Sequence, residues 1–112
     1  MMKMEMNKKT LETRWYHYIL AFFAGVFFVN TLPHYINGIT GKEFPTPFAD
    51  PPGIGLSSAL TNVLWAVINA SLGASIFLFV KINKRKISLW IALAAGGLLM
   101  SFFVAYYFST RF

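Results

Sequence analysis

The chain has 112 residues, of which 56% are hydrophobic and only 12% are charged. Soluble globular domains carry roughly 25% charged residues, so this composition excludes an ordinary water-soluble domain and indicates an integral membrane protein. No cysteine is present, which excludes disulfides, thiolate metal sites and cysteine nucleophiles. The net charge of +6 does not indicate nucleic-acid binding, because the basic residues lie at the ends of apolar segments and form no stripe.

Three apolar segments are long enough to cross a bilayer, for which a helix needs ~20 residues. We expect an all-α membrane protein with a single domain, whose transmembrane helices span residues 15–35, 57–82 and 87–110. The connecting parts are a basic tail, a Pro-rich loop and a basic turn, at residues 1–14, 36–56 and 83–86. Because the turn is short, the second and third helices should form an antiparallel hairpin.

The first apolar segment follows a basic start, so a cleaved signal peptide competes with a retained helix. No small-x-small cleavage site follows the apolar run, which favours the retained helix. Pro33 either ends this helix or splays its last turn. Five prolines lie between residues 33 and 52, so we expect no helix of any length beyond Tyr35.

The distribution of basic residues predicts the orientation through the positive-inside rule. With three spans, the tail and the basic turn share a side, and that side collects eight of the ten basic residues. We therefore expect a multi-pass membrane protein with a cytoplasmic N-terminus and an extracytoplasmic loop and C-terminus. Anionic lipid headgroups are the partners expected for the turn, near Lys81, Lys84, Arg85 and Lys86.

Polar side chains inside apolar helices are costly unless they find partners, so they mark the candidate site. Asn62 and Asn69 lie seven residues apart and share one helical face. Asn30, His34 and Asn37 recur at spacings of four and three on the first helix. We expect these five side chains to line a polar pocket, with Asn30 facing Asn62 and His34 above them. Hydrogen bonds that merely join the helices are the alternative reading of these residues.

The Pro-rich loop contains turn signals and little conformational freedom, which suits a rigid cap over this pocket or a docking surface. Its polar residues are further site candidates: Glu43, Asp50, Ser57 and Ser58. The acids and His34 match no established catalytic or metal-binding spacing. We therefore predict no catalytic residue, no metal and no cofactor.

Four motifs around this loop are PHxxNG, FPTPFA, PPGxGLSS and NVLWxxxN, all within residues 33–69. Together they resemble a pattern in small uncharacterised bacterial membrane proteins. The resemblance implies a bacterial inner membrane and emphasises the loop, Asn62 and Asn69. It carries no established activity and so implies no function.

Small residues on the third helix lead to the first interpretation of function. Ala92 and Gly96 form one stripe, and Gly97, Ser101 and Ala105 form a second, which is more than one hairpin partner needs. We predict a non-enzymatic protein that acts through helix packing, as a homo-oligomer or as an accessory subunit of a membrane complex. One alternative is a small oligomeric channel or transporter whose path uses the polar pocket. Another is a membrane enzyme or lipid-binding protein with a site under the loop.

Overall fold

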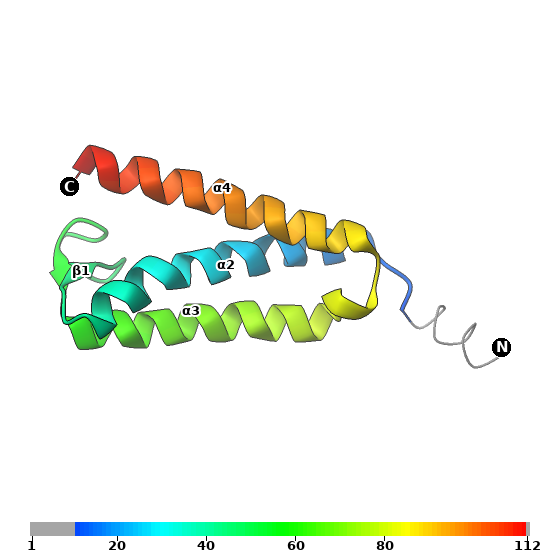
Figure 1. Ribbon diagram of the computed structural model, residues 1–112, viewed down its shortest axis with the longest axis horizontal. Helices are drawn as coiled ribbons and strands as arrows, with labels where there is room; N and C mark the ends of the chain where they lie inside the picture. The colour runs from blue at the N-terminus through cyan, green and yellow to red at the C-terminus, as the bar shows by residue number, and fades with distance from the viewer. Residues whose placement is uncertain (1–10, 112) are drawn as a thin grey trace.

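The computed structural model describes residues 11–111, which form three long helices (Figure 1). α2 spans Trp15–Ile39, α3 spans Ala59–Val80 and α4 spans Ile87–Arg111. Between α2 and α3, the short strands β1 and β2 pair antiparallel, and a 3-10 helix, η1, precedes α4; their bounds are Phe44–Pro45, Leu56–Ser57 and Ile82–Lys84. All three long helices have the length and hydropathy to cross a membrane. The predicted helical fold with three membrane-length helices is therefore confirmed, while residues 1–10 of the predicted tail lie outside the described residues.

α2 lies between α3 and α4 (Figure 1). Both outer helices pack along α2, whereas α3 and α4 make few contacts with each other. One of these contacts lies near the turn, where the ring centroids of Phe77 and Trp90 are 5.5 Å apart. The second and third segments run antiparallel and are joined by a short turn, as predicted, but they pack on α2 and hardly on each other. The turn carries the chain across the width of α2, so the central helix separates them.

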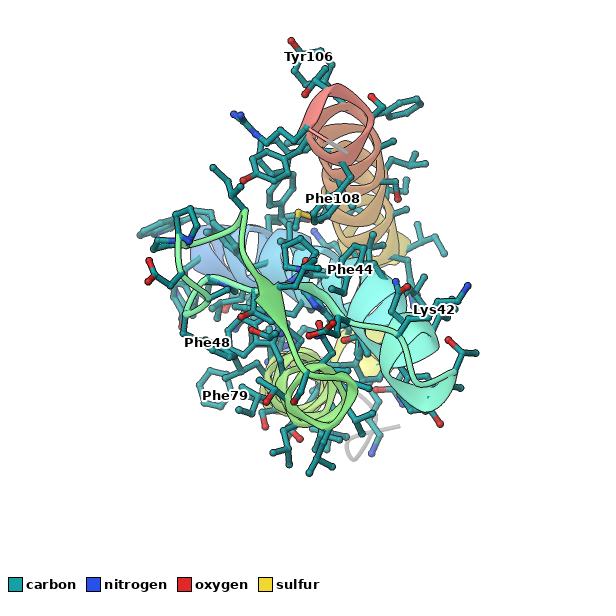
Figure 2. All side chains as sticks on the ribbon, turned by 90° about the vertical axis from the view of Figure 1, so that its left-hand side faces the viewer. Lys42, Phe44, Phe48, Phe79, Tyr106 and Phe108 are labelled. Carbon is teal, nitrogen blue, oxygen red and sulfur yellow. The ribbon has the colours of Figure 1, made fainter. Side chains whose placement is uncertain are left out.

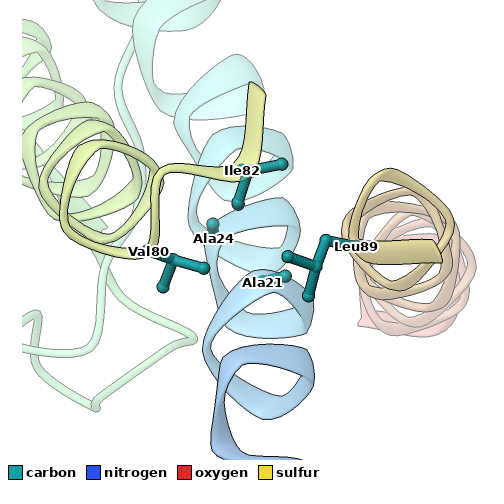
Figure 3. Close-up of a cluster of buried hydrophobic side chains, with 5 residues drawn as sticks. All are labelled: Ala21, Ala24, Val80, Ile82 and Leu89. Atoms are coloured by element: carbon teal, nitrogen blue, oxygen red, sulfur yellow. The ribbon is translucent and has the colours of Figure 1, made fainter. Parts of the chain in front are cut away.

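Small side chains of α2 allow close packing at the end that holds the turn, here called the turn end (Figure 3). Ala21 and Ala24 are fully buried between Val80 and Ile82 on one side and Leu89 of α4 on the other. In a bilayer, lipid is as apolar as these side chains, so van der Waals packing drives their association.

Glycines permit the close approach of α2 and α4. A Cβ at Gly25 would collide with the backbone carbonyl of Leu93, and a Cβ at Gly96 would collide with that of Phe22. Gly97 is also buried, so both predicted stripes place a glycine against α2. Beyond this crossing, α4 leans away from the other helices toward its C-terminus (Figure 1). The helices diverge at the end of the bundle that holds residues 40–58, here called the loop end.

α2 continues past Pro33 to Ile39, so the prediction that no helix follows Tyr35 is wrong. Two interactions support the extra turn. The amide Nδ2 of Asn37 donates to the Pro33 carbonyl at 2.7 Å, and Gly38 packs so closely on α3 that a Cβ there would lie 2.9 Å from a carbonyl oxygen. Tertiary packing thus outweighs the local cost of the proline, and the other four prolines lie beyond the helix.

The turn end is organised by Arg85. Its Nε donates to the carbonyl of Val80, the last residue of α3, at 2.5 Å, and its Nη1 donates to the carbonyl of Glu12 at 2.7 Å. Arg85 thereby satisfies a carbonyl that the helix end leaves unpaired. The lysines of the predicted basic turn are exposed: Lys81, Lys84 and Lys86.

Candidate functional site

A cavity of about 420 Å³ lies at the loop end, where α4 diverges from the other helices. α2 lines it with Asn30 and His34, and α3 lines it with Trp65. The remaining lining comes from α4 and from the loop: Met100, Phe103, Val104, Tyr107 and Phe108, then Pro45, Thr46, Pro47, Pro52 and Gly53. The lining contains no Asp, Glu, Lys or Arg among the described residues, so the site is aromatic with a few neutral polar groups.

The loop folds back over the bundle through its own hydrogen bonds. β1 pairs with β2 so that Phe44 stands opposite Ser57. The hydroxyl of Thr46, a buried residue, lies 2.6 Å from that of Ser57, and the Thr46 carbonyl accepts the N–H of Gly53 at 2.8 Å. These bonds give the loop a fixed inner surface over the cavity.

The loop contacts α4 at Tyr107 and Phe108. The Tyr107 hydroxyl donates to the carbonyl of Gly53 at 2.8 Å. Figure 2 looks onto the loop end and shows Phe44 reaching from β1 toward Phe108, with ring centroids 4.7 Å apart. The loop therefore bridges the space between α3 and the diverging end of α4 and covers the cavity.

His34 and Asn62 form the buried polar centre beside the cavity. The Asn62 Nδ2 lies within 3.0–3.2 Å of three carbonyl oxygens, those of Phe44, Ser57 and Ser58. An amide nitrogen is the donor in such a cradle, so Oδ1 faces the Nδ1 of His34, 2.7 Å away. His34 must then donate through Nδ1. Its Nε2 makes no hydrogen bond within residues 11–111 and is the acceptor of the neutral ring.

A second polar pair, formed by two asparagine amides, lies farther from the loop along the same helices. Asn69 Nδ2 donates to the carbonyl of Trp65 at 2.8 Å, which directs its Oδ1 to Asn30. The Nδ2 of Asn30 donates to that oxygen at 3.0 Å. The remaining acceptor of Asn30, its Oδ1, has no hydrogen-bond partner in the described part of the chain.

Trp65 contributes its ring to the site. Its ring lies against Phe48 of the loop, with centroids 5.3 Å apart, and its centroid is 6.4 Å from that of His34. The indole Nε1 is buried and has no hydrogen-bond partner in the structure as described. Buried N–H groups are almost always paired, so this indole is an exception; its Nε1 has almost no accessible surface and is therefore not open to a ligand in the cavity.

The predicted pairing of Asn30 with Asn62 is wrong, since Asn30 pairs with Asn69 and His34 pairs with Asn62. The cause is the extra turn of α2. With this turn, the midpoint of α2 lies about two residues, or ~3 Å, nearer to the loop end than the sequence predicts. Asn30 is therefore nearer to the middle of the helix and level with Asn69.

Of the five residues predicted to line the pocket, only Asn30 and His34 do so; Asn62 and Asn69 bond to them from outside the lining, and the remaining candidates do not line the cavity either. Asn37 bonds to its own helix, Ser57 bonds to Thr46, and Ser58 caps α3 by accepting the N–H of Thr61 at 3.1 Å. The exposed acids of the loop, Glu43 and Asp50, contribute nothing to the lining. Within residues 11–111, no group of three His, Asp or Glu side chains is placed to hold a metal ion.

The wall that α4 contributes to the cavity is not singled out by the sequence. Its five members recur at spacings of three and one, which is one face of a helix: Met100, Phe103, Val104, Tyr107 and Phe108. In an apolar segment this signal is weak, because lipid-facing positions are equally apolar. The tyrosine at position 107 was the available clue, since a hydroxyl on that face calls for a partner.

Comparison of the chain with protein-family models, with curated proteins and with solved structures finds no match. The resemblance of its loop motifs to those of small bacterial membrane proteins stays a prediction. The function is therefore interpreted from the chemistry of the cavity.

Proposed function

We propose that this chain is a non-enzymatic inner-membrane protein that binds a lipophilic small molecule in the cavity at the loop end. The observation that carries the proposal is the cavity itself, which is walled by rings and covered by the loop. Small-molecule sites have volumes of roughly 300–1,000 Å³ and mostly apolar linings with a few placed polar groups. The cavity, with about 420 Å³ and its neutral polar groups on α2 and α3, fits this description.

The arrangement of the helices supports access from the bilayer. α3 and α4 make few contacts with each other, and the cavity lies where α4 diverges. Phe103, which lines the cavity, is also 58% exposed, so the cavity wall continues onto the lipid-facing surface. A lipophilic molecule would enter sideways between α3 and α4 and leave its tail in the lipid.

A channel through one copy of the chain has less support. Gly25 and Gly96 bring α2 and α4 into backbone contact, and the buried cluster around Ala21 and Val80 fills the turn end. Close packing therefore separates the cavity from the opposite membrane face.

The charge distribution supports an orientation in which the turn end is cytoplasmic. Lys81, Lys84 and Lys86 are exposed there, where they would meet anionic headgroups. The loop and the cavity would then lie in the outer half of the membrane. Accessibility of single cysteines introduced at Lys42 and Lys84 to a membrane-impermeant thiol reagent tests this orientation, and labelling of Lys84→Cys alone in intact cells would contradict it.

The binding proposal is tested by filling the cavity. Val104→Trp and Met100→Trp place an indole in the lining, and Leu98→Trp makes a matched change on a side chain of α4 that is 61% exposed and does not line the cavity. Each protein is extracted from its native membrane in lipid nanodiscs, and its bound small molecules are measured by mass spectrometry. We expect wild type and Leu98→Trp to carry the same lipophilic molecule, and the two filled variants to carry at least about tenfold less.

Equal retention in all four proteins would contradict binding in this cavity. Wild-type protein that carries a partner protein and no small molecule would also contradict it, and would favour an accessory subunit that acts through helix packing.

A further inference from the structure

The polar groups of the cavity define which hydrogen bonds a ligand has to offer. Asn30 Oδ1 and His34 Nε2 are acceptors without partners among residues 11–111, and they lie on successive turns of α2. Their roles are fixed by the amides of Asn69 and Asn62, which already accept from these two side chains. The site therefore presents two acceptors on one wall. A matching ligand carries two donors.

The ligand has to be neutral. An anion would face two acceptors with no Lys or Arg in the described lining. A cation would find no carboxylate, and the guanidinium of Arg111 already lies over the Tyr107 ring, 4.5 Å from its centroid. Burying an unpaired charge in such surroundings is costly. Neutral hydroxyl groups are donors without charge, so they satisfy the acceptors of α2 at no such cost.

The walls favour a flat ring. Phe103, Tyr107 and Phe108 of α4 face Trp65 of α3 across the cavity, with prolines of the loop above. Aromatic side chains pack well against a ring in stacked or edge-on arrangements. Hydroxyls at opposite edges of one ring can reach acceptors on two successive helical turns, about 5–6 Å apart.

We propose that the bound molecule is a lipophilic quinol, a p-dihydroxybenzene ring with an apolar tail, held with its hydroxyls donating to Asn30 and His34. This inference rests on the proposed function. It adds a preference between redox forms, because the corresponding quinone has only acceptor oxygens and would place them against the acceptors of α2. A dimethyl ether of the quinol keeps the ring and tail and loses both donors.

The preference is tested by competition in nanodiscs that hold the wild-type chain. A quinol with a photoactivatable diazirine in its tail is cross-linked in the presence of unlabelled quinol, quinone or dimethyl ether, under anaerobic conditions and at equal mole fractions in the lipid. We expect the quinol to compete at a mole fraction about tenfold lower than the ether or the quinone. In His34→Leu the ether should still compete, which shows that the cavity is folded, and the advantage of the quinol over it should shrink to about threefold or less.

Each outcome decides a separate point. Equal competition by quinol and ether in wild type overturns the hydroxyl recognition and leaves the binding of lipophilic molecules intact. Equal competition by quinone and quinol overturns the preference for donors. If none of the three compounds competes and the wild-type protein retains an unrelated lipophilic molecule, the identification of the ligand as a quinol is overturned. If none competes and the wild-type protein retains no small molecule, the proposed function is overturned as well.

Discussion

The Nδ1 of His34 lies 2.7 Å from the Oδ1 of Asn62, and the same asparagine holds the loop through the carbonyl of Phe44. One buried amide thus joins α2, α3 and the loop. It also fixes the histidine as a donor on one side, which leaves Nε2 as an acceptor beside the cavity. The position of the loop and the hydrogen-bonding role of His34 therefore depend on the same residue.

Replacing Asn62 should therefore destabilise the loop end. Asn62→Leu leaves the His34 N–H and the loop carbonyl without a partner, and an unpaired buried polar group costs about 1–3 kcal/mol. We expect a loss of at least this size in unfolding by a denaturing detergent. Asn37→Leu is the matched control, because it removes one bond to a carbonyl of the same helix, and it should cost less than half as much. A smaller loss for Asn62→Leu than for Asn37→Leu would contradict the shared role of Asn62.

The pairing of Asn30 with Asn69 is tested by a double-mutant cycle. Asn30→Leu, Asn69→Leu and the double variant should show a coupling of about 0.6 kcal/mol, with ~1.7 kcal/mol as the upper end for membrane proteins. The measurement is the free energy of unfolding in detergent. A cycle between Asn30 and Asn62 should give coupling near zero, because these side chains do not bond to each other. The opposite pattern would restore the pairing expected from the sequence.

Gly96 should tolerate no side chain. A methyl group there would collide with the carbonyl of Phe22, so Gly96→Ala has to push α4 away from α2. We expect a loss of about 1–3 kcal/mol, as for other overpacked sites. Ala95→Leu is the control, because Ala95 is exposed on the same helix, and it should change the unfolding free energy by less than about 0.5 kcal/mol. Equal effects of the two changes would exclude backbone contact at this crossing.

Arg85 should differ from its basic neighbours. Arg85→Ala removes two bonds to backbone carbonyls that join the end of α3 to the segment before α2. Hydrogen bonds from charged donors contribute about 1.5–3 kcal/mol, so we expect a loss of this order in thermal unfolding. Lys84→Ala, at an exposed neighbour, should leave stability unchanged and weaken only binding to anionic vesicles. A stability loss that is the same in both variants would show that the turn acts through charge alone.

The sequence predicts the helices and the polar positions of the site, because length, hydropathy and helical spacing act locally. It does not predict their partners. The continuation of α2 beyond Pro33 depends on the packing of Gly38 against α3. Without this turn the depth of Asn30 is misjudged, and so is its partner. The bond between Tyr107 and Gly53 joins residues 54 positions apart. It exists because α4 crosses α2 at two glycines and then diverges, a geometry set by tertiary contacts that no local pattern encodes.

The most direct measurement of the central claim is a map of the sites labelled by a small uncharged aromatic diazirine dissolved in bilayers that contain the protein. We expect saturable labelling of Met100 and Trp65, in excess of Leu98 and Phe102, which are 61% and 73% exposed on α4 and do not line the cavity. Val104→Trp should remove this excess. Labelling that follows lipid exposure alone and is unchanged in Val104→Trp would contradict a binding cavity beneath the loop.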